Sequence, residues 1–290
     1  MWISKNIAII IFLSVPAVFS QAADFTPSSL QKIYDQLHES VCILTFTQEV
    51  TDARTGEQQR QDGNAVALIV SPEGLVLSNG HLQQNDINTF NFQVHIRRNN
   101  TEEKYPAVLL EKPDDINISL LQIQSEKPLN LPGVRFRRNR GLSLGEPVAL
   151  IGLMSENMDF QRCIQVERIC AVLNESHTTY CLTEGLRLGF VTSPVVNVRG
   201  EAVGIVGFDL TRAEGGGVFT HPGHPLVFQS NRFMKYIDTP PDISENSLRT
   251  KEAWLGVFTQ PLTEDYAIYW GIEKPGGLIV STVVPGSPAA

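Results

Sequence analysis

The stretch that decides the fold is residues 63–82, GNAVALIVSPEGLVLSNGHL. It contains two apolar runs, residues 65–70 and 75–77, with the turn residues Ser-Pro-Glu-Gly between them. Apolar runs of this length on either side of a Pro/Gly turn are typical of two short strands. A polar segment that ends at His81 follows the second run. The pattern therefore predicts a strand pair that places one histidine at a strand-to-loop junction.

The rest of the chain continues this pattern of short strands separated by turns. One amphipathic helix is predicted to begin at Thr26-Pro27, because the apolar residues that follow, up to Leu37, recur at helical spacing. Further strands are predicted at residues 41–46, 90–96, 107–110, 118–123, 147–151, 164–172, 178–182, 194–197, 202–208 and 225–229. Short strands at this spacing, with few helices, predict an all-β sandwich or a pair of barrels.

Composition sets the broad class of protein. The chain has 290 residues, which favours one large unit with an extra segment, and 42% hydrophobic against 19% charged residues suffices for a packed core. A net charge of −8 disfavours a nucleic acid or an anionic membrane surface as a partner. Residues 238–252 are polar and start near two prolines, so we predict a linker there, with residues 253–290 beyond it.

The N-terminal residues are typical of a secretory signal. Lys5 precedes an apolar run over residues 7–18, and Ser20-Gln21-Ala22 offers small residues at the positions that a signal peptidase reads. The run is shorter than the roughly 20 residues that a helix needs to span a bilayer, so a permanent anchor is the weaker interpretation. We predict a signal peptide over residues 1–22 and an exported protein, periplasmic or secreted, without a stable membrane span.

Export makes the four cysteines, Cys42, Cys163, Cys170 and Cys181, candidates for disulfides rather than metal ligands. Cys170 and Cys181 flank a predicted hairpin, and a four-residue loop places them directly opposite each other. We therefore predict a Cys170–Cys181 disulfide. The alternative is four small buried thiols, and the pairing of Cys42 and Cys163 stays open.

A metal site is not expected. His221 and His224 have the spacing of a ligand pair, but no carboxylate or cysteine accompanies them, and zinc sites need three or four ligands. We predict a turn at these residues, and neither a metal nor a cofactor for the protein.

Residues 63–82 closely resemble the segment around the catalytic histidine of the HtrA-type (Deg) serine proteases, with Gly80 where the family usually has alanine. Five further segments resemble the family in its own order: NISLLQI at 117–123, LGEPVALIG at 144–152, GEAVGI at 200–205, PLVFQSN at 225–231 and AWLGV at 253–257. The resemblance covers most of the chain after the signal. It implies a chymotrypsin-like double six-stranded β-barrel over residues 23–237, followed by a partial PDZ domain over residues 253–290.

The same resemblance places a catalytic triad of which two members are replaced. His81 retains the base position, but Asn117 stands at the acid position, and counting back from Pro194 puts Val191 at the nucleophile position. An amide in place of the acid can hold the imidazole in the wrong tautomer, which costs roughly 10⁴-fold in kcat. Valine has no nucleophilic atom. Gly189 keeps its place at the oxyanion position.

Substitutes for the missing groups are few. Thr192 and Ser193 replace two glycines after the nucleophile position, and either could serve as a shifted nucleophile because the preceding loop is one residue short. Asp114 and Asp115 lie two or three residues before Asn117, a displacement of roughly 7–10 Å along a strand, which is too far for a replacement acid.

These residues predict an exported HtrA-like pseudoprotease that binds polypeptide segments or protein C-termini, in partnership with active relatives. The resemblance implies a peptide-binding loop at Trp254, Leu255, Gly256 and Val257, and a homotrimer. The alternative is an active HtrA-type serine endopeptidase that uses Ser193 or Thr192 with His81.

Overall fold

A computed structural model of the chain describes residues 24–51, 58–83, 87–98, 101–138, 140–174, 177–185, 187–208, 225–244, 255, 257–272, 277–283 and 289. The predicted signal peptide lies outside the described residues, as do His221, His224, Trp254 and Gly256. Within the described ranges, no helix is long and apolar enough to cross a membrane.

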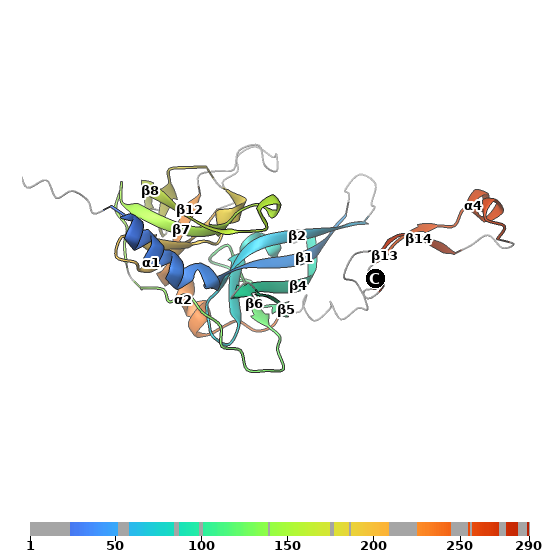
Figure 1. Ribbon diagram of the computed structural model, residues 1–290, viewed down its shortest axis with the longest axis horizontal. Helices are drawn as coiled ribbons and strands as arrows, with labels where there is room; N and C mark the ends of the chain where they lie inside the picture. The colour runs from blue at the N-terminus through green and yellow to red at the C-terminus, as the bar shows by residue number, and fades with distance from the viewer. Residues whose placement is uncertain are drawn as a thin grey trace, which may run out of the picture.

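The first half of the described chain forms a closed six-stranded antiparallel barrel (Figure 1). Its strands are β1 (Val41–Thr51), β2 (Gln58–Ile69), β3 (Leu75–Asn79), β4 (Ile87–Arg98), β5 (Thr101–Leu109) and β6 (Ile118–Ile123). They are hydrogen-bonded in the order β1-β2-β3-β6-β5-β4. Alternate side chains point inward, so Cys42, Leu44 and Phe46 of β1 are buried inside the barrel. The strand pair predicted from residues 63–82 is β2 with β3, in which Leu68 pairs with Leu77.

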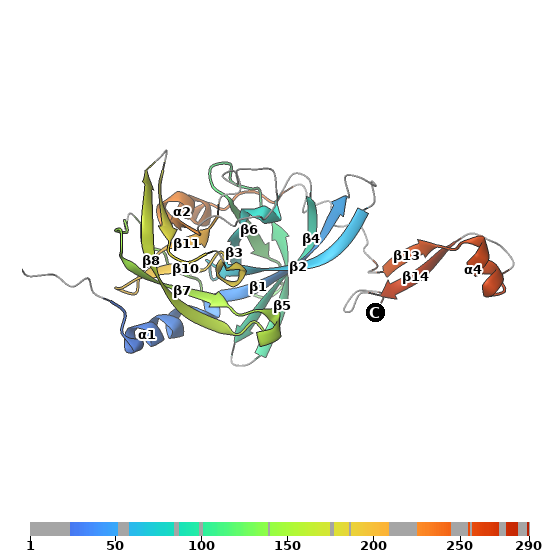
Figure 2. The same ribbon diagram turned by 90° about the horizontal axis from the view of Figure 1, so that it is seen from above.

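A second closed barrel follows, with strands β7 (Pro147–Leu153), β8 (Arg162–Asn174), β9 (Thr178–Leu182), β10 (Pro194–Asn197), β11 (Ala202–Gly207) and β12 (Leu226–Gln229). Their order around the barrel is β10-β11-β12-β9-β8-β7. Figure 2 shows the two barrels side by side, with β7, β8, β10 and β11 in one and β1 to β6 in the other. The predicted double six-stranded β-barrel is confirmed.

Two α-helices flank the barrels, α1 (Pro27–Leu37) and α2 (Ser230–Asp238), and short 3-10 helices η1 (His38–Ser40), η2 (Gly80–Leu82), η3 (Glu156–Met158) and η4 (Leu188–Phe190) occupy the connections. The Thr26 hydroxyl caps α1 by accepting from the Ser29 amide at 3.2 Å, so the helix begins where the sequence predicts.

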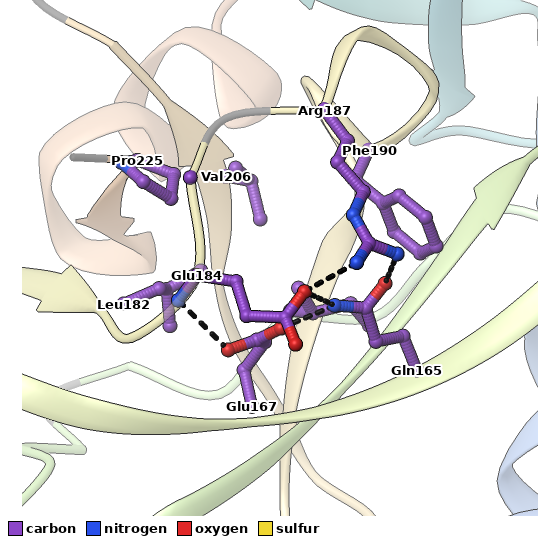
Figure 3. A pocket seen from close by; sticks show the side chains of 10 residues that line it. Gln165, Glu167, Leu182, Glu184, Arg187, Phe190, Val206 and Pro225 are labelled. Carbon is purple, nitrogen blue, oxygen red and sulfur yellow. Dashed lines mark hydrogen bonds and ion pairs between the residues drawn. The ribbon is translucent and has the colours of Figure 1, made fainter. Parts of the chain in front are cut away.

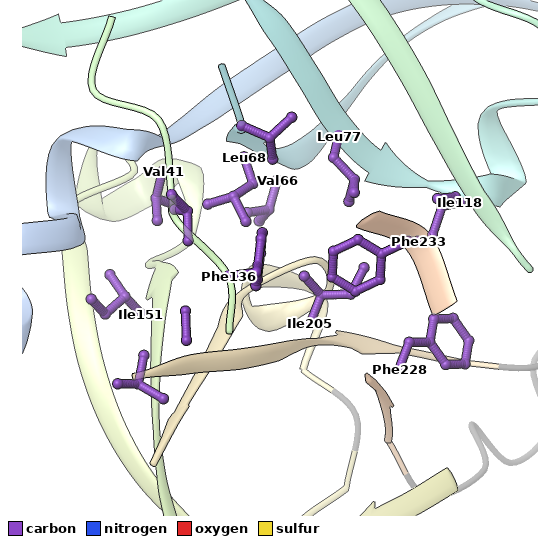
Figure 4. Close-up of a cluster of buried hydrophobic side chains, with 14 of the residues drawn as sticks. Val41, Val66, Leu68, Leu77, Ile118, Phe136, Ile151, Ile205, Phe228 and Phe233 are labelled. Atoms are coloured by element: carbon purple, nitrogen blue, oxygen red, sulfur yellow. The ribbon is translucent and has the colours of Figure 1, made fainter. Parts of the chain in front are cut away.

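One apolar core joins the two barrels (Figure 4). Its members come from both barrels, from the segment between them and from α2: Val41, Val66, Leu68, Leu77, Ile118, Phe136, Ile151, Ile205, Phe228 and Phe233. The rings of Phe136 and Phe233 meet edge to face, with centroids 4.9 Å apart and planes at 87°. Phe233 has no exposed surface, so α2 is fastened where the two barrels meet.

The predicted Cys170–Cys181 disulfide is wrong. All four cysteine side chains are thiols. A β-bulge between Ile169 and Ala171 absorbs one residue of β8, so Ala171 and not Cys170 pairs with Cys181. Cys170 is exposed and its Sγ donates to the Leu182 carbonyl at 3.1 Å, whereas Cys181 is buried. The bulge thus directs the two thiols to different environments.

Beyond the barrels, β13 (Val257–Pro261) and β14 (Leu278–Val283) form a two-stranded antiparallel sheet, with α4 (Glu264–Tyr269) between them in the chain. The partial PDZ domain stays a prediction, because these elements alone do not define one.

The start of the predicted linker is attached to the first barrel. The Glu111 amide donates to the Asp242 carbonyl at 2.8 Å, and the Ser244 amide donates to the Leu109 carbonyl at 3.0 Å.

Replacing Phe233 with alanine is expected to lower the free energy of unfolding of the barrels by about 3–5 kcal/mol, because it opens a cavity in the shared core. Urea unfolding followed by far-UV circular dichroism measures the change in the free energy of unfolding. Leu144, which is 68% exposed on the second-barrel side, is the control, and its change to alanine should stay within about 0.5 kcal/mol. Equal effects of the two substitutions would contradict the role assigned to Phe233.

Candidate functional site

His81 lies at the end of β3, at the junction that the sequence predicts. The Asn79 side chain accepts from the His81 amide at 3.2 Å and so starts the single turn η2. Leu82 on the same turn is buried in the first barrel. The backbone on both sides of His81 is therefore held by a cap and by core packing.

The surroundings of His81 do not suit a general base. Burial first, and the positive charge of Lys112 second, lower the pKa of His81 from 6.5 to about 4. Its Nδ1 atom is buried and has no hydrogen-bond partner in the part of the chain that the structure describes. A carboxylate at that atom would orient the ring and stabilise the imidazolium. At neutral pH the ring is instead neutral, no carboxylate among the described residues orients it, and its pKa lies far from the range in which base catalysis is efficient.

Lys112 is a residue that sequence reasoning missed. Its Nζ donates to the Gly80 carbonyl at 2.8 Å and lies 3.4 Å from the Gln83 carbonyl. These contacts hold a cation beside the turn that carries His81. In a working triad the charge next to the histidine is negative, so Lys112 inverts the electrostatics of the site. No local sequence signal marks it, because it lies on a loop 31 positions away in the chain.

Asn117, which the resemblance predicts at the acid position, makes no hydrogen bond to the histidine Nδ1. Its Nδ2 donates to the Phe208 carbonyl at 3.3 Å, and its backbone carbonyl accepts from the Gly80 amide at 3.1 Å. A Cβ added at Gly80 would lie only 2.1 Å from Asn117 Oδ1. The two residues therefore fit each other: the amide occupies the space that an alanine methyl group would fill, which explains the glycine before His81.

Asp115 is not available as a replacement acid. Its carboxylate accepts from Lys235 Nζ at 2.7 Å and from the Tyr236 hydroxyl at 2.6 Å, both on α2. Partial burial acts to raise the pKa of Asp115, but these two hydrogen bonds outweigh it and lower the pKa overall. The carboxylate is thus committed to anchoring α2.

The residue predicted at the nucleophile position, Val191, is buried and has no nucleophilic atom. Val191 directly follows η4 and is 3% exposed. Its amide donates to the Leu188 carbonyl at 3.2 Å, so this N–H is engaged within the loop instead of facing a reacting oxygen. Gly189 is constrained by packing, since a Cβ there would lie 2.0 Å from the Leu153 carbonyl oxygen.

The two alternative nucleophiles are also sequestered. Thr192 is 1% exposed and Ser193 is 0% exposed, and neither buried hydroxyl oxygen has a hydrogen-bond partner among the described residues. Thr192 also has φ +73°, a left-handed conformation that strains a β-branched residue. In this arrangement neither hydroxyl can reach a substrate carbonyl.

A pocket that the sequence did not reveal lies at one end of the second barrel (Figure 3). Its lining residues come from β7, β8, β9, β11, the loop before Val191 and the residue before β12: Leu150, Gln165, Glu167, Leu182, Glu184, Gly185, Arg187, Phe190, Val206 and Pro225. Four of them form a polar network at its mouth. Arg187 donates to Glu184 at 2.5 Å and to Gln165 at 3.0 Å, and Gln165 donates to Glu184 at 3.3 Å and closely to Glu167.

Of the predicted peptide-binding loop, only Leu255 and Val257 are described. Leu255 is 59% exposed and its carbonyl accepts from the Ala289 amide at 3.1 Å, and Val257 opens β13. The role of this loop stays a prediction. Among the described residues, no group of three or more His, Cys, Asp or Glu side chains could hold a metal ion.

The sequence of the barrel region is similar to that of known peptidases. Residues 65–205 match the model of the trypsin-like peptidase domain. A probable periplasmic serine endoprotease, DegP-like, of Pseudomonas putida is 26% identical over 245 residues, covering 81% of this chain and 46% of that protein. The protein of the same description from Hahella chejuensis is 27% identical over 244 residues, covering 81% and 47%. The chain thus spans about half the length of the curated relatives it matches.

Solved structures support the same fold. The HtrA-type protease AlgW with a decapeptide superposes with a TM-score of 0.53 at 18% identity, covering 90% of this chain and 81% of that chain. AlgW with a tripeptide gives a TM-score of 0.51 at 17% identity, covering 90% and 78%.

The pKa of His81 is expected to rise when Lys112 is replaced by methionine, because removal of a nearby cation favours the imidazolium. Burial remains in the variant, so the pKa should stay below 6.5. NMR titration of the His81 ring measures the shift. The control is Lys104→Met, which should change the pKa of His95, where Lys104 contributes, and leave His81 unchanged. An unaltered His81 pKa in Lys112→Met would refute the inverted electrostatics.

Alanine at Gly80 should destabilise the protein by about 1–3 kcal/mol, since the new methyl group must displace Asn117. Thermal or urea unfolding measures the loss. Gly185→Ala is the matched control, because a Cβ there meets nothing within 4 Å, and it should be near neutral. A neutral Gly80→Ala variant would show that the contact with Asn117 is not tight.

Proposed function

Because this chain belongs to the HtrA-type family of trypsin-like serine proteases, we propose that it is an exported, polypeptide-binding member that has lost serine-protease chemistry. The observation that carries the proposal is Val191, buried at the position where the family has its serine. A side chain without a nucleophilic atom removes acyl-enzyme formation altogether. The second candidate, a protease that uses Ser193 or Thr192, requires the loop to expose a hydroxyl that is buried in this structure.

The histidine side of the site supports the same proposal. A triad works because an acid fixes the histidine tautomer and balances the imidazolium charge. Here the amide of Asn117 is engaged with Phe208, and the charge beside His81 is the cation of Lys112. Restoring chemistry would therefore take more than a serine at position 191. A site that lacks both the acid and the nucleophile would bind polypeptide chains without cleaving them.

Polypeptide binding is proposed from the retained fold and from the relatives. Two of the AlgW structures are described with a decapeptide and with a tripeptide, so peptide binding by those proteins supports the proposal. Export is proposed from the signal pattern of residues 1–22 and from relatives described as periplasmic. The proposed partners include protein C-termini and active relatives of the same family. The proposed assembly is a homotrimer.

One experiment with two readouts tests the function. The purified protein is mixed with fluorescently labelled unfolded casein, and binding is followed by anisotropy while cleavage is followed by gel. We expect saturable binding without cleavage, and no labelling by a fluorophosphonate probe. The binding should persist in His81→Ala, since no step of it uses the imidazole.

Cleavage or labelling by the natural protein that disappears in Ser193→Ala or His81→Ala would establish the second candidate instead. Absence of both binding and cleavage would overturn the polypeptide-binding proposal. The variant Val191→Ser with Asn117→Asp is a useful companion: if it cleaves casein where the natural protein does not, the two substitutions account for the lost chemistry.

A further inference from the structure

The connection between the two barrels carries four arginines within six positions. Residues 134–141 read VRFRRNRG, and no acidic residue occurs from Lys127 to Gly145. We call the side chains of Arg135, Arg137, Arg138 and Arg140 the arginine surface. Its charge is opposite in sign to the net charge of −8 of the whole chain. It therefore suits a small anionic partner that the rest of the molecule would repel.

The backbone that carries the arginine surface is held by both barrels. The Val134 amide donates to the Ile69 carbonyl of the first barrel at 2.9 Å, and the Arg137 amide donates to the Ala202 carbonyl of the second barrel at 2.8 Å. Phe136 is buried in the core that joins the barrels (Figure 4). The segment is thus in place before any partner binds, which lowers the entropic cost of binding.

Arg135 and Arg137 project from the same side of this segment. Both are exposed, whereas Val134 and Phe136 are buried, and this alternation is that of an extended strand. Alternate residues of an extended chain lie roughly 6.5 Å apart. A polypeptide that lies extended along the segment has the same spacing between its own alternate side chains. Two acidic residues at i and i+2 would therefore face both arginines.

The acidic residues beside the arginine surface are too few to neutralise it. Glu201 lies 3.7 Å from Arg137 Nε and 3.7 Å from Arg140 Nε, so one carboxylate is shared by two guanidinium groups. Arg138 pairs with Asp238. Two carboxylates thus face four guanidinium groups, and the surface keeps an excess of positive charge.

Most N–H groups of the arginine surface are free to bind a partner. The contacts with Glu201 are longer than hydrogen bonds, and the side chains of Arg137 and Arg140 donate no hydrogen bond to any described residue. Arg135 has no ion pair within the described part of the chain, and the side chain of Arg137 is 72% exposed. A guanidinium holds five N–H donors in a planar fork that matches a carboxylate. The surface therefore offers charge and donors in the geometry that carboxylates require.

We propose that the arginine surface binds an extended acidic segment of a polypeptide, with carboxylates at alternate positions on Arg135 and Arg137. Arg138 and Arg140 add positive charge beside them. A nucleic acid or an anionic membrane would bring many negative charges close to a chain of net charge −8, whereas a short acidic segment meets the arginine surface alone. The inference goes beyond the proposed function, because it adds a separate binding surface that uses no residue of the His81 site.

The test uses the full chain and three fluorescein-labelled nonapeptides of alanine and serine that differ only at their centre. One carries two Glu at alternate positions, the second carries two adjacent Glu, and the third carries two Gln at alternate positions. Anisotropy at low salt gives each dissociation constant. We expect the alternate-Glu peptide to bind about tenfold more tightly than the Gln peptide, the range of two exposed ion pairs. It should bind about threefold more tightly than the adjacent-Glu peptide, whose carboxylates point to opposite sides.

The double variant Arg135→Gln with Arg137→Gln should remove most of this preference, because both charges are lost. The backbone amides that hold the segment are unchanged, and circular dichroism establishes that each variant is folded. The matched control is Arg60→Gln with Arg168→Gln, which removes the same charge from two exposed arginines outside the arginine surface. Its dissociation constants should stay within about twofold of those of the natural protein, because distant exposed charges are screened.

Three outcomes would overturn the inference. The first is equal binding of the alternate-Glu and Gln peptides, and the second is a preference that the double variant keeps. The third is equal binding of the two Glu peptides, which would refute the register on Arg135 and Arg137. A labelled nine-residue thymidine oligonucleotide is added as a comparison, and tighter binding of it than of the alternate-Glu peptide would assign the surface to nucleic acid instead.

Unfolded casein separates this inference from the proposed function. If casein binds the natural protein and the double variant equally while no nonapeptide binds, the inference is wrong and polypeptide binding stands. If neither casein nor any nonapeptide binds, both fail.

Discussion

The apolar core between the two barrels is the constraint on which the rest of the structure depends. Each barrel closes on itself, but the face that joins them is shared, and the edge-to-face pair of Phe136 and Phe233 lies within it. His81 comes from the first barrel and Val191 from the second. The relative position of His81 and Val191 is therefore set by this core and by α2. It does not depend on which side chains stand at the two positions. A fold held in this way can lose its chemistry without losing its shape.

The region around His81 shows how several substitutions become mutually dependent. Gly80 leaves the room that the Asn117 amide occupies, and Lys112 binds the carbonyl of the same glycine. Burial and the charge of Lys112 lower the pKa of His81, and its Nδ1 has no hydrogen-bond partner among the described residues. The polar groups that remain serve the backbone and α2, as the engagement of Asp115 with Lys235 illustrates. This arrangement is the basis on which loss of the histidine's catalytic function is proposed.

The loop from Glu184 to Ser193 differs in character from the barrels around it. It holds a left-handed threonine, two buried hydroxyls without partners and an exposed Glu184–Arg187 ion pair. Features of this kind cost stability and persist where the surrounding structure holds them in place. Here the surrounding structure is the second barrel, whose interior receives Phe190 and whose open end forms the pocket. In this loop Val191, the residue predicted at the nucleophile position, is buried, and Phe190 before it packs in the barrel interior.

The sequence by itself determined the strand pattern, the helix at Pro27 and the place of His81 at the end of a strand, whereas the triad positions it assigned to Asn117 and Val191 stay predictions. These features are local, since alternation and turn residues report which side of a strand is buried. It failed where one residue of register matters: the bulge at Cys170 turned an expected disulfide into two separated thiols. Only the tertiary structure brought Lys112 beside His81, Asn117 over Gly80, and Glu167, Glu184 and Arg187 around one pocket. Such contacts join residues from different strands and loops, and their distances follow from barrel closure and loop packing, which no local pattern encodes.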